Sequence, residues 1–434
     1  MDRKSKAWAI RSDHYTNNTV ATIFIPAPHF PPSAMPPSQR VRLLVRHLHT
    51  LGWKPVIFTV DHYYREELAD PWMLDITGDQ FEKVEVGCLD QRKTRKFKIG
   101  DLGIRMFFHL FFSLLKHARK RKPALILYPV PPWYIMVMAP FIKWFSGVPY
   151  AIDYIDPWIF KVPENDRKAK MSQWVARTLE GFVVKRSSAI FAVSQGILND
   201  LISRYPVVKS IPLVPVPYGV EPTDFLTIKV SRPENEKVIL RYTGAVSSAM
   251  LPVADALFKA LRLVNQQIPL QVEFTGTSYA GIGLAQPVLE PLIIENDVQS
   301  FVTENPNRVG YRTALELSMG ADMQLLMGDT TQYYAASKLM GMVASGRPFF
   351  AFVHKGSFPS TFLDSLNFAG KVDFIASELN DEKTIRELAD SLLNAIRRRH
   401  EFNPIDINNS SLNQHTAFAM AQTFSNTLQK IVHE

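Results

Sequence analysis

Apolar runs of strand length alternate with segments of helical periodicity along the first half of the chain. After the run at 20–27, apolar residues recur at helical spacing through 41–51, where Ser38 can cap the helix and Gly52 can end it. Further runs follow at 55–60, 125–130, 149–156 and 188–194. Strands separated by helices in this way predict a parallel sheet with helices on both of its faces.

The second half repeats this alternation. Strands are predicted at 238–246, 270–277 and 372–377, and the segments 308–328 and 337–353 each give a helix followed by a strand. Helices are predicted at about 252–267, 380–400 and 411–432. Ligands of doubly wound sheets bind beyond the carboxyl ends of the strands, so two such halves predict a binding cleft where they meet.

Length and composition agree with a globular protein of two domains. The chain has 434 residues, more than a single core usually holds, with 46% hydrophobic and 21% charged residues. A single cysteine, Cys88, excludes an intramolecular disulfide and fits a reducing compartment, and no Cys/His cluster has zinc spacing. The first residues lack the apolar core of a signal peptide, and no apolar run reaches membrane-spanning length. A cytoplasmic location is therefore expected.

Net charge differs between the two halves. Residues 1–220 contain 31 Lys and Arg against 18 Asp and Glu, a net charge of +13. Residues 221–434 contain 18 against 23, a net charge of −5. This asymmetry indicates that the two halves meet different partners, and that only the first half suits an anionic surface.

Residues 92–122 combine concentrated positive charge with a dense apolar centre. The segment holds eleven Lys and Arg, and its one acidic residue is Asp101. One interpretation is a basic amphipathic helix that lies on anionic lipid, and the other is a core helix with basic flanks. Nucleic acid is not an expected partner, because no recognised binding module accompanies the charge.

Seven segments spread over most of the chain carry a family resemblance. They are "PPSAMPPSQRVRLLVRHLHTLGW" (31–53), "VPYAIDYIDPW" (148–158), "SSAIFAVSQGILNDLISRYP" (187–206), "VPYGVEPTDF" (216–225), "RYTGAV" (241–246), "EFTGT" (273–277) and "YYAASKLMGMVASGRP" (333–348). In this order and spacing, the sequence resembles retaining glycosyltransferases of the GT-B fold, glycosyltransferase family 4, also called glycosyl transferases group 1.

The resemblance implies an α/β chain of two Rossmann-like, doubly wound domains that face each other across a cleft. Residues 1–220 would bind the acceptor, residues 221–405 would bind the nucleotide-sugar donor, and residues 406–434 would form a helix crossing back to the first domain. The implied activity moves a sugar from a nucleoside diphosphate sugar to a hydroxyl of a polysaccharide or lipid-linked glycan, with retention. It needs no metal and no cofactor besides the nucleotide-sugar substrate.

Three residues match positions to which the family gives a role. Gly244, after the first strand of the second half, matches the glycine that approaches the diphosphate, and Gly276 matches the glycine near the nucleotide base. Asp156 matches the carboxylate of the family's strand-end motif and is the expected catalytic residue, orienting the acceptor hydroxyl. Its position before Pro157 also suits a simple turn residue, so that alternative stays open.

The sequence departs from the family at the donor site. The usual two glutamates, eight positions apart, fall on Tyr333 and Gly341, so the carboxylate that grips the ribose is missing. The usual Arg and Lys after the first donor strand are replaced by the uncharged run 245–251. Lys338 is the expected replacement cation, unless it is only a solvated lysine at a helix start. The expected donor-binding side chains besides the two glycines are Arg241, Tyr333, Ser337 and Lys338.

Two other functions remain open. The missing carboxylates at 333 and 341 suit a non-catalytic GT-B protein that binds a glycan or a partner enzyme of a polysaccharide assembly system. A sugar-nucleotide epimerase of the same fold would need more acid and base groups in the cleft than the sequence offers. His14, His29 and His354 are isolated in the sequence, and none is expected to bind a ligand. Attachment to the inner face of the membrane is the location expected if 92–122 binds lipid.

Overall fold

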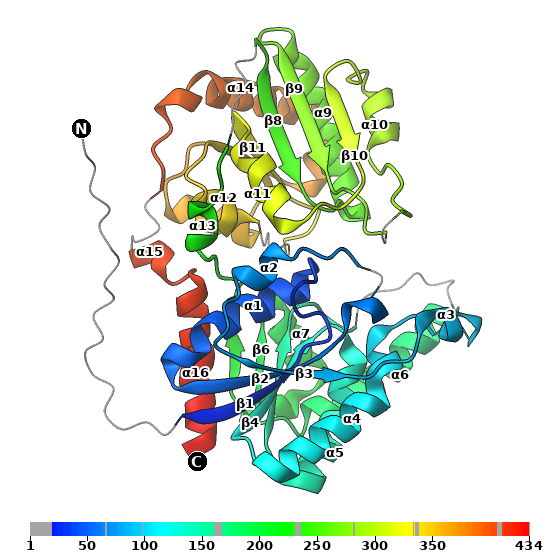
Figure 1. Cartoon of the computed structure of the whole chain (residues 1–434). Helices are drawn as coiled ribbons and strands as arrows, with labels where there is room; N and C mark the ends of the chain where they lie inside the picture. The colour runs from blue at the N-terminus through cyan, green and yellow to red at the C-terminus, as the bar shows by residue number, and fades with distance from the viewer. Residues whose placement is uncertain are drawn as a thin grey trace.

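The chain folds into two α/β domains stacked one above the other (Figure 1). The computed structural model describes residues 20–65, 67–97, 99–159, 167–230, 236–280, 283–332, 334, 338–405 and 410–433. Each domain is built on one parallel sheet, and strand β8 (Val238–Thr243) of the second domain points its carboxyl end toward the first domain (Figure 1).

The first domain contains a seven-stranded parallel sheet in the order β3-β2-β1-β4-β5-β6-β7. Its strands are β1 (Ala21–Pro26), β2 (Trp53–Val60), β3 (Glu82–Val86), β4 (Leu125–Val130), β5 (Tyr150–Tyr154), β6 (Ala189–Ala192) and β7 (Leu213–Pro215). Its helices are α1 (Pro36–Leu48), α2 (Trp72–Asp75), α3 (Gln91–Thr94), α4 (Leu102–Arg121), α5 (Ala139–Ser146), α6 (Arg167–Val184) and α7 (Gln195–Arg204). Helices α4 to α7 cover one face of the sheet and α1 covers the other.

The second domain contains a six-stranded parallel sheet in the order β10-β9-β8-β11-β12-β13. After β8 its strands are β9 (Leu270–Thr275), β10 (Val302–Asn305), β11 (Met323–Met327), β12 (Phe349–His354) and β13 (Lys371–Phe374). Its helices are α8 (Thr223–Leu226), α9 (Leu251–Asn265), α10 (Glu290–Glu295), α11 (Tyr311–Met319), α12 (Leu339–Ala344), α13 (Phe358–Ser365) and α14 (Glu382–Arg397). In both sheets the strand order reverses next to the first strand, which is where doubly wound folds bind ligands.

The last helix returns to the first domain, as predicted. After α15 (Ser410–Asn413), helix α16 (Ala417–His433) runs along the first domain beside α1 (Figure 1). The Trp53 indole donates to Ser425 Oγ (2.9 Å), and the rings of Phe191 and Phe424 lie 4.3 Å apart. Gly219 in the turn before the second domain has no room for a side chain, because a Cβ would lie 2.7 Å from the Thr416 carbonyl oxygen.

Local departures from the predicted elements have identifiable causes. Helix α1 begins at Pro36 with Met35 as its N-cap, so Ser38 lies buried inside the first turn and does not cap the helix. Proline in the first turn costs no backbone hydrogen bond and favours this earlier start. Strands β3, β7 and β10 were not predicted, and each is an edge strand of its sheet. Edge strands bury fewer side chains, so their sequences lack the continuous apolar run of a central strand.

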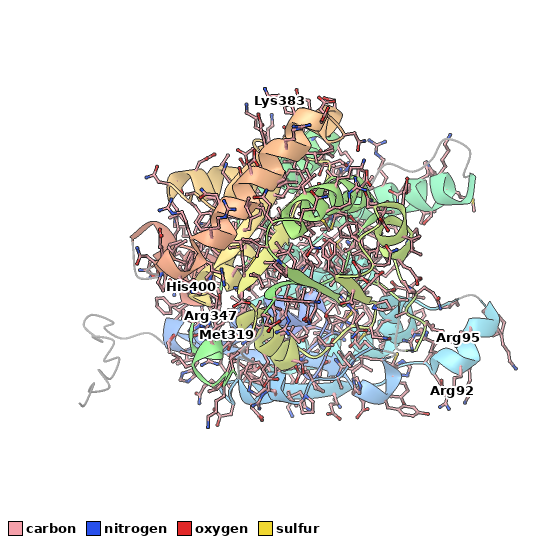
Figure 2. The ribbon with its side chains drawn as sticks, turned by 90° about the horizontal axis from the view of Figure 1, so that it is seen from above. Arg92, Arg95, Met319, Arg347, Lys383 and His400 are labelled. Atoms are coloured by element: carbon pink, nitrogen blue, oxygen red, sulfur yellow. The ribbon has the colours of Figure 1, made fainter. Side chains whose placement is uncertain are left out.

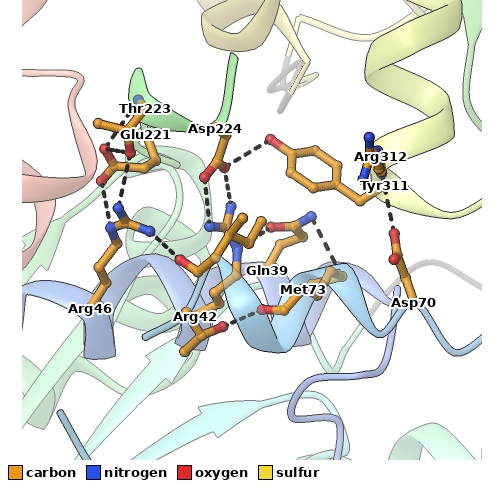
Figure 3. A network of polar contacts seen from close by, with 12 residues as sticks. Gln39, Arg42, Arg46, Asp70, Met73, Glu221, Thr223, Asp224, Tyr311 and Arg312 are labelled. Carbon is orange, nitrogen blue, oxygen red and sulfur yellow. Dashed lines mark hydrogen bonds and ion pairs between the residues drawn. The ribbon is translucent and has the colours of Figure 1, made fainter. Parts of the chain in front are cut away.

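A network of buried polar side chains joins the two domains (Figure 3). Arg42 of α1 donates two hydrogen bonds to the Asp224 carboxylate, at 2.6 and 3.2 Å, and both side chains are 1% exposed. The Tyr311 hydroxyl of α11 donates to the same carboxylate at 3.3 Å, while the Arg312 amide donates to Asp70 at 3.2 Å. The network therefore fixes α1 of the first domain against α8 and α11 of the second.

A second carboxylate stabilises the turn between the domains. Glu221 Oε2 lies 2.7 Å from His47 Nε2, and Glu221 Oε1 accepts a hydrogen bond from the Thr223 hydroxyl at 2.7 Å. Burial opposes ionisation of Glu221, but these contacts and the nearby charge of Arg46 lower its pKa to about 2. Glu221 is therefore a carboxylate at neutral pH and holds α1 to the turn.

We expect Arg42→Ala to lower the free energy of unfolding by about 3–5 kcal/mol, because Asp224 would keep a buried charge without its partner. Arg386→Ala breaks the pair with Glu382 on α14, whose side chains are 70% and 78% exposed, so it should cost less than about 1 kcal/mol. Urea unfolding followed by circular dichroism measures both. Equal effects of the two substitutions would contradict a stabilising role for the pair that joins the domains.

Candidate active site

A cavity of about 280 Å³ lies between the two domains, at the carboxyl ends of β8 and β9. Its wall from the first domain includes Pro36, Gln39 and Arg42 of α1. Its wall from the second domain includes Gly244, Gly276, Arg308, Lys338 and Gly341. The structure thus brings three of the predicted donor-binding residues, the two glycines and Lys338, to one cavity.

The two glycines form a wall without side chains. Gly244 has φ +136° and Gly276 has φ +78°, in a region of backbone conformation that favours glycine. Their amides donate to the carbonyls of Thr275 (2.7 Å) and Asn305 (2.8 Å), so both N–H groups are already bonded. A Cβ at position 244 would overlap the end of the Lys338 side chain. The glycines therefore contribute space for close approach and do not contribute amide donors.

Lys338 places its ammonium at this wall. The side chain is half-buried, and its Nζ lies 4.0 Å from the centroid of the Tyr242 ring, a cation–π contact. Within the described residues, no ion pair joins Lys338 to a carboxylate. Burial, together with the neighbouring charge of Arg308, lowers the pKa of Lys338 to about 7. An anion that enters the cavity would therefore strongly stabilise the charged form of Lys338.

Arg308 is a second cation at the same wall, and the sequence analysis missed it. It lies in the loop between β10 and α11, and its Nη1 is 3.0 Å from Met35 Sδ of the first domain. Its Cα would be 3.8 Å from a Cβ at Gly276, and no ion pair to a carboxylate is found for it among the described residues. A basic residue just beyond a strand is a usable sequence signal, but β10 itself was not predicted.

Arg241, another predicted donor-binding residue, does not line the cavity. Strand pairing sets it beside Glu273 on β9, and its Nε donates to the Glu273 carboxylate at 2.6 Å. Its Nη1 donates to the Leu317 carbonyl at 3.1 Å. These bonds hold Arg241 between β8, β9 and α11 and leave it no cavity-facing role. Tyr333 and Ser337 lie outside the described residues.

A larger cavity of about 560 Å³ adjoins the first and shares Ala34, Arg308 and Val309 with it. His29 and Glu67 line its first-domain side, with His29 Nδ1 2.7 Å from Glu67 Oε2. The histidine is therefore not isolated, as its sequence context suggested, but paired at a cavity wall. Two adjoining cavities that share the Arg308 side chain offer room for two substrates in contact.

Asp156 follows β5 and is exposed to solvent beside these cavities. Desolvation raises its pKa above the usual range, and its charge acts on the tyrosine rings of both domains. Its negative charge helps to raise the pKa of Tyr218 in the first domain and that of Tyr279, beyond β9, in the second. Burial is the main cause of both shifts. Asp156 is therefore near tyrosines of both domains, although it is not part of either cavity wall.

Within the described ranges, no three His, Cys, Asp or Glu side chains gather as a metal site. Among the helices that the structure describes, none has both the length and the apolar character needed to cross a bilayer.

Comparison with known proteins identifies the fold and a similarity to one family over part of the chain. Residues 37–219 match the family model described as "Glycosyl transferase 4-like domain". Sucrose-phosphate synthase from Thermosynechococcus elongatus aligns over 95% of this chain and 99% of its own, with a TM-score of 0.59 and 13% identity. The α,α-trehalose 6-phosphate synthase from Burkholderia multivorans aligns over 96% and 98%, with a TM-score of 0.60 and 11% identity.

A third solved structure, Anabaena HepE in complex with UDP, aligns over 94% of this chain and 100% of its own, with a TM-score of 0.53 and 12% identity. No curated protein matches the sequence. The whole chain has the GT-B fold, which confirms the predicted fold class. Residues 37–219 are similar to the glycosyl transferase 4-like family, in agreement with the predicted family resemblance over that part of the chain.

Gly244→Ala should weaken the binding of UDP or GDP by at least about tenfold, because its Cβ would displace the Lys338 ammonium. Gly78→Ala is the matched control, since Gly78 also has positive φ (+81°) but nothing within 4 Å of a Cβ. Both substitutions carry a backbone cost of about 1–3 kcal/mol, and the overlap with Lys338 adds to it in Gly244→Ala, whose melting temperature should fall further. Titration calorimetry that finds equal nucleotide affinity in the two variants would contradict the proposed contact.

Any diphosphate that binds at Lys338, with UDP as the probe, should bind more weakly as the pH rises through about 7, because Lys338 loses its proton there. Above that pH, linkage predicts a loss of up to about tenfold per pH unit. The terminal phosphate of UDP titrates near pH 6 by itself, so the comparison is with Lys338→Arg, whose guanidinium stays charged. Titration of UDP from about pH 6 to about pH 8.5 should give a steeper loss in the wild type. Parallel pH profiles would rule out Lys338 as the titrating contact.

Proposed function

We propose that this protein transfers a sugar from a nucleoside diphosphate sugar to a hydroxyl group of a glycan. The observation that carries the proposal is the pair of cations at the cavity wall, Lys338 and Arg308, at the point where glycines allow a ligand to approach the backbone. The diphosphate of such a donor needs both nearby cations and a wall without side chains that it can approach closely. The Anabaena neighbour HepE is described in complex with UDP and with UDP-glucose, which supports this class of donor.

The two cations would act mainly on the leaving group. When the bond between the anomeric carbon and the diphosphate oxygen breaks, the electron pair goes to the diphosphate, whose negative charge grows. Cations already fixed in a partly dry site stabilise that charge without rearranging at the moment of reaction. Lys338 and Arg308 thereby replace the Arg and Lys that the family carries after its first donor strand.

The acceptor would enter from the larger cavity. Its hydroxyl must reach the anomeric carbon beside the diphosphate, and the shared wall at Arg308 lies between the two cavities. Asp156, which lies near tyrosines of both domains, would orient that hydroxyl. Retention, and a polysaccharide or lipid-linked acceptor, are proposed on the family resemblance.

The second candidate is a non-catalytic GT-B protein that binds a glycan or a partner of a polysaccharide assembly system. Gly341 lines the cavity where the family carries its ribose-gripping glutamate, and a Cβ there would meet only the Phe225 ring, at 3.8 Å. The cavity therefore has a glycine and an aromatic ring where a ribose would be held by a carboxylate.

Thermal unfolding with UDP, GDP and their sugars separates the two candidates. A ligand at a hundred times its dissociation constant stabilises the folded chain by about 2.7 kcal/mol, which raises the melting temperature measurably. We expect a shift in the wild type and in Lys259→Ala, whose lysine pairs with Asp255 on α9, but a much smaller shift in Lys338→Ala. A lack of shift with every nucleotide would favour the non-catalytic candidate.

A further inference from the structure

The outer side of helices α4, α5 and α6 carries large apolar side chains that the fold does not bury. On α4, Phe108 is 69% exposed and Phe112 is 64% exposed. Trp144 of α5 is 79% exposed and Trp174 of α6 is 68% exposed. Single exposed apolar residues are ordinary, but several aromatic rings on neighbouring helices are not.

Helix α4 has two separate apolar stripes. Met106, Leu110 and Leu114 are fully buried and pack on the sheet. Ile104, Phe108 and Phe112 follow one another at four-residue spacing and are all exposed, so they form one outward stripe. The core is complete without this second stripe. The structure thus shows α4 as a core helix that also presents an apolar outer side, and the lipid-binding interpretation stays a prediction.

The three helices form one continuous surface. Arg119 near the end of α4 donates to the Phe145 carbonyl of α5 at 3.2 Å, and Trp144 stacks on Phe145 at 5.4 Å. Phe141 of α5 lies 5.5 Å from the ring of Phe182 of α6. We name as the outer aromatic face the exposed side chains Ile104, Phe108, Phe112, Phe141, Trp144, Phe145, Met171 and Trp174.

Most of the charge around the outer aromatic face is positive, although Arg121 is paired with Glu82 of β3. The only acidic residue in the sequences of α4, α5 and α6 is Glu180, which is buried and bonded to Arg204. The exposed basic residues on and directly after α4 and α6 are Lys116, Arg119, Lys120, Arg121, Lys122, Lys170, Arg177, Lys185 and Arg186. Basic residues continue onto the neighbouring α3 segment, where Arg92 and Arg95 project from the edge of the molecule (Figure 2).

We propose that the outer aromatic face docks on an anionic lipid surface, with its rings at the level of the headgroups and the basic side chains against lipid phosphates. Aromatic rings flanked by Lys and Arg suit the interface of a bilayer, and the charge is complementary to acidic lipids. A second copy of the chain would bring two positive faces together, which like-charge repulsion opposes.

The position of α4 connects this surface to the cleft. Asp101, Leu102 and Arg105, at the start of α4, line the larger cavity, and the outward stripe begins at Ile104. A docked chain would hold the mouth of that cavity close to the lipid. If the proposed glycosyl transfer is correct, this placement suits an acceptor that is anchored in the membrane. Docking itself does not depend on that activity.

The test is co-sedimentation of the full chain with vesicles of phosphatidylcholine alone or with about one third phosphatidylglycerol. We expect binding to the mixed vesicles only, weakened by salt. Phe108→Ser with Phe112→Ser, and separately Lys116→Glu with Lys120→Glu, should each weaken binding by about tenfold or more. Lys383→Glu, on α14 of the other domain (Figure 2), should leave it unchanged. Unchanged melting temperatures in all variants would show that the fold is intact.

Three results would overturn the proposal. If the phenylalanine substitutions do not reduce vesicle binding, the surface binds lipid by charge alone and the aromatic rings are not involved. Equal binding to an RNA oligonucleotide, lost in the same variants, would identify a nucleic-acid surface. A dimer in light scattering that Phe108→Ser dissociates would identify a second copy as the occupant. None of these measurements includes a nucleotide-sugar donor or an acceptor sugar, so they fail or succeed independently of the proposed transfer reaction.

Discussion

Two buried arginines of α1 hold the chain where the domains meet: Arg42 crosses the boundary, and Arg40 binds within the first domain. Arg40 is bonded through Nε and Nη2 to the Asp153 carboxylate, both at 2.9 Å, and through Nη1 to the Pro217 carbonyl at 3.0 Å. Arg42 is bonded to Asp224 across the domain boundary. A buried guanidinium without its carboxylate is costly, so each pair admits few arrangements of its neighbours. The cavity between the domains depends on this arrangement, because its two walls come from different domains.

The contrast between paired and unpaired cations separates structural from binding groups. Arg40, Arg42 and Arg241 each have a carboxylate partner in the fold. Lys338 and Arg308 lie close enough for one charge to lower the pKa of the other, and no ion pair with a carboxylate involves either within the part of the chain described. Two cations held together without a counter-charge are unfavourable unless an anion joins them. A diphosphate is the anion that the proposed reaction would bring to them.

The loss of the family's glutamate pair limits how the donor is held. In the proposed arrangement the phosphates are gripped by charge, while the ribose meets Gly341 and the Phe225 ring. Charge neutralisation at the leaving group is the larger part of catalysis in this chemistry, and ribose contacts add mainly affinity and choice of nucleotide. A protein that kept the cations at the leaving group and lost the ribose contacts would remain able to react. A protein that only binds a glycan or a partner would need neither the cations nor the ribose contacts, which is why nucleotide binding distinguishes the two candidates.

The sequence by itself determined the fold class and the position of the central strands, because buried strands such as β4 are continuous apolar runs bounded by turn residues. It also named Gly244 and Gly276 from the family resemblance and Lys338 as a replacement cation, and the structure brings all three to one cavity. The edge strands were missed, and with β10 the cation beyond it, Arg308.

Only the tertiary structure decided which charges are free to bind. Strand register sets Arg241 opposite Glu273, and domain packing sets His29 against Glu67 at a cavity wall. The sequence of α4 contains two apolar stripes, and only the folded structure shows which of them packs on the sheet and which faces outward. Local sequence fixes which element forms, because backbone preferences and periodicity act between near neighbours. The partner of a charged or aromatic side chain lies far away in sequence, so only the folded chain assigns it.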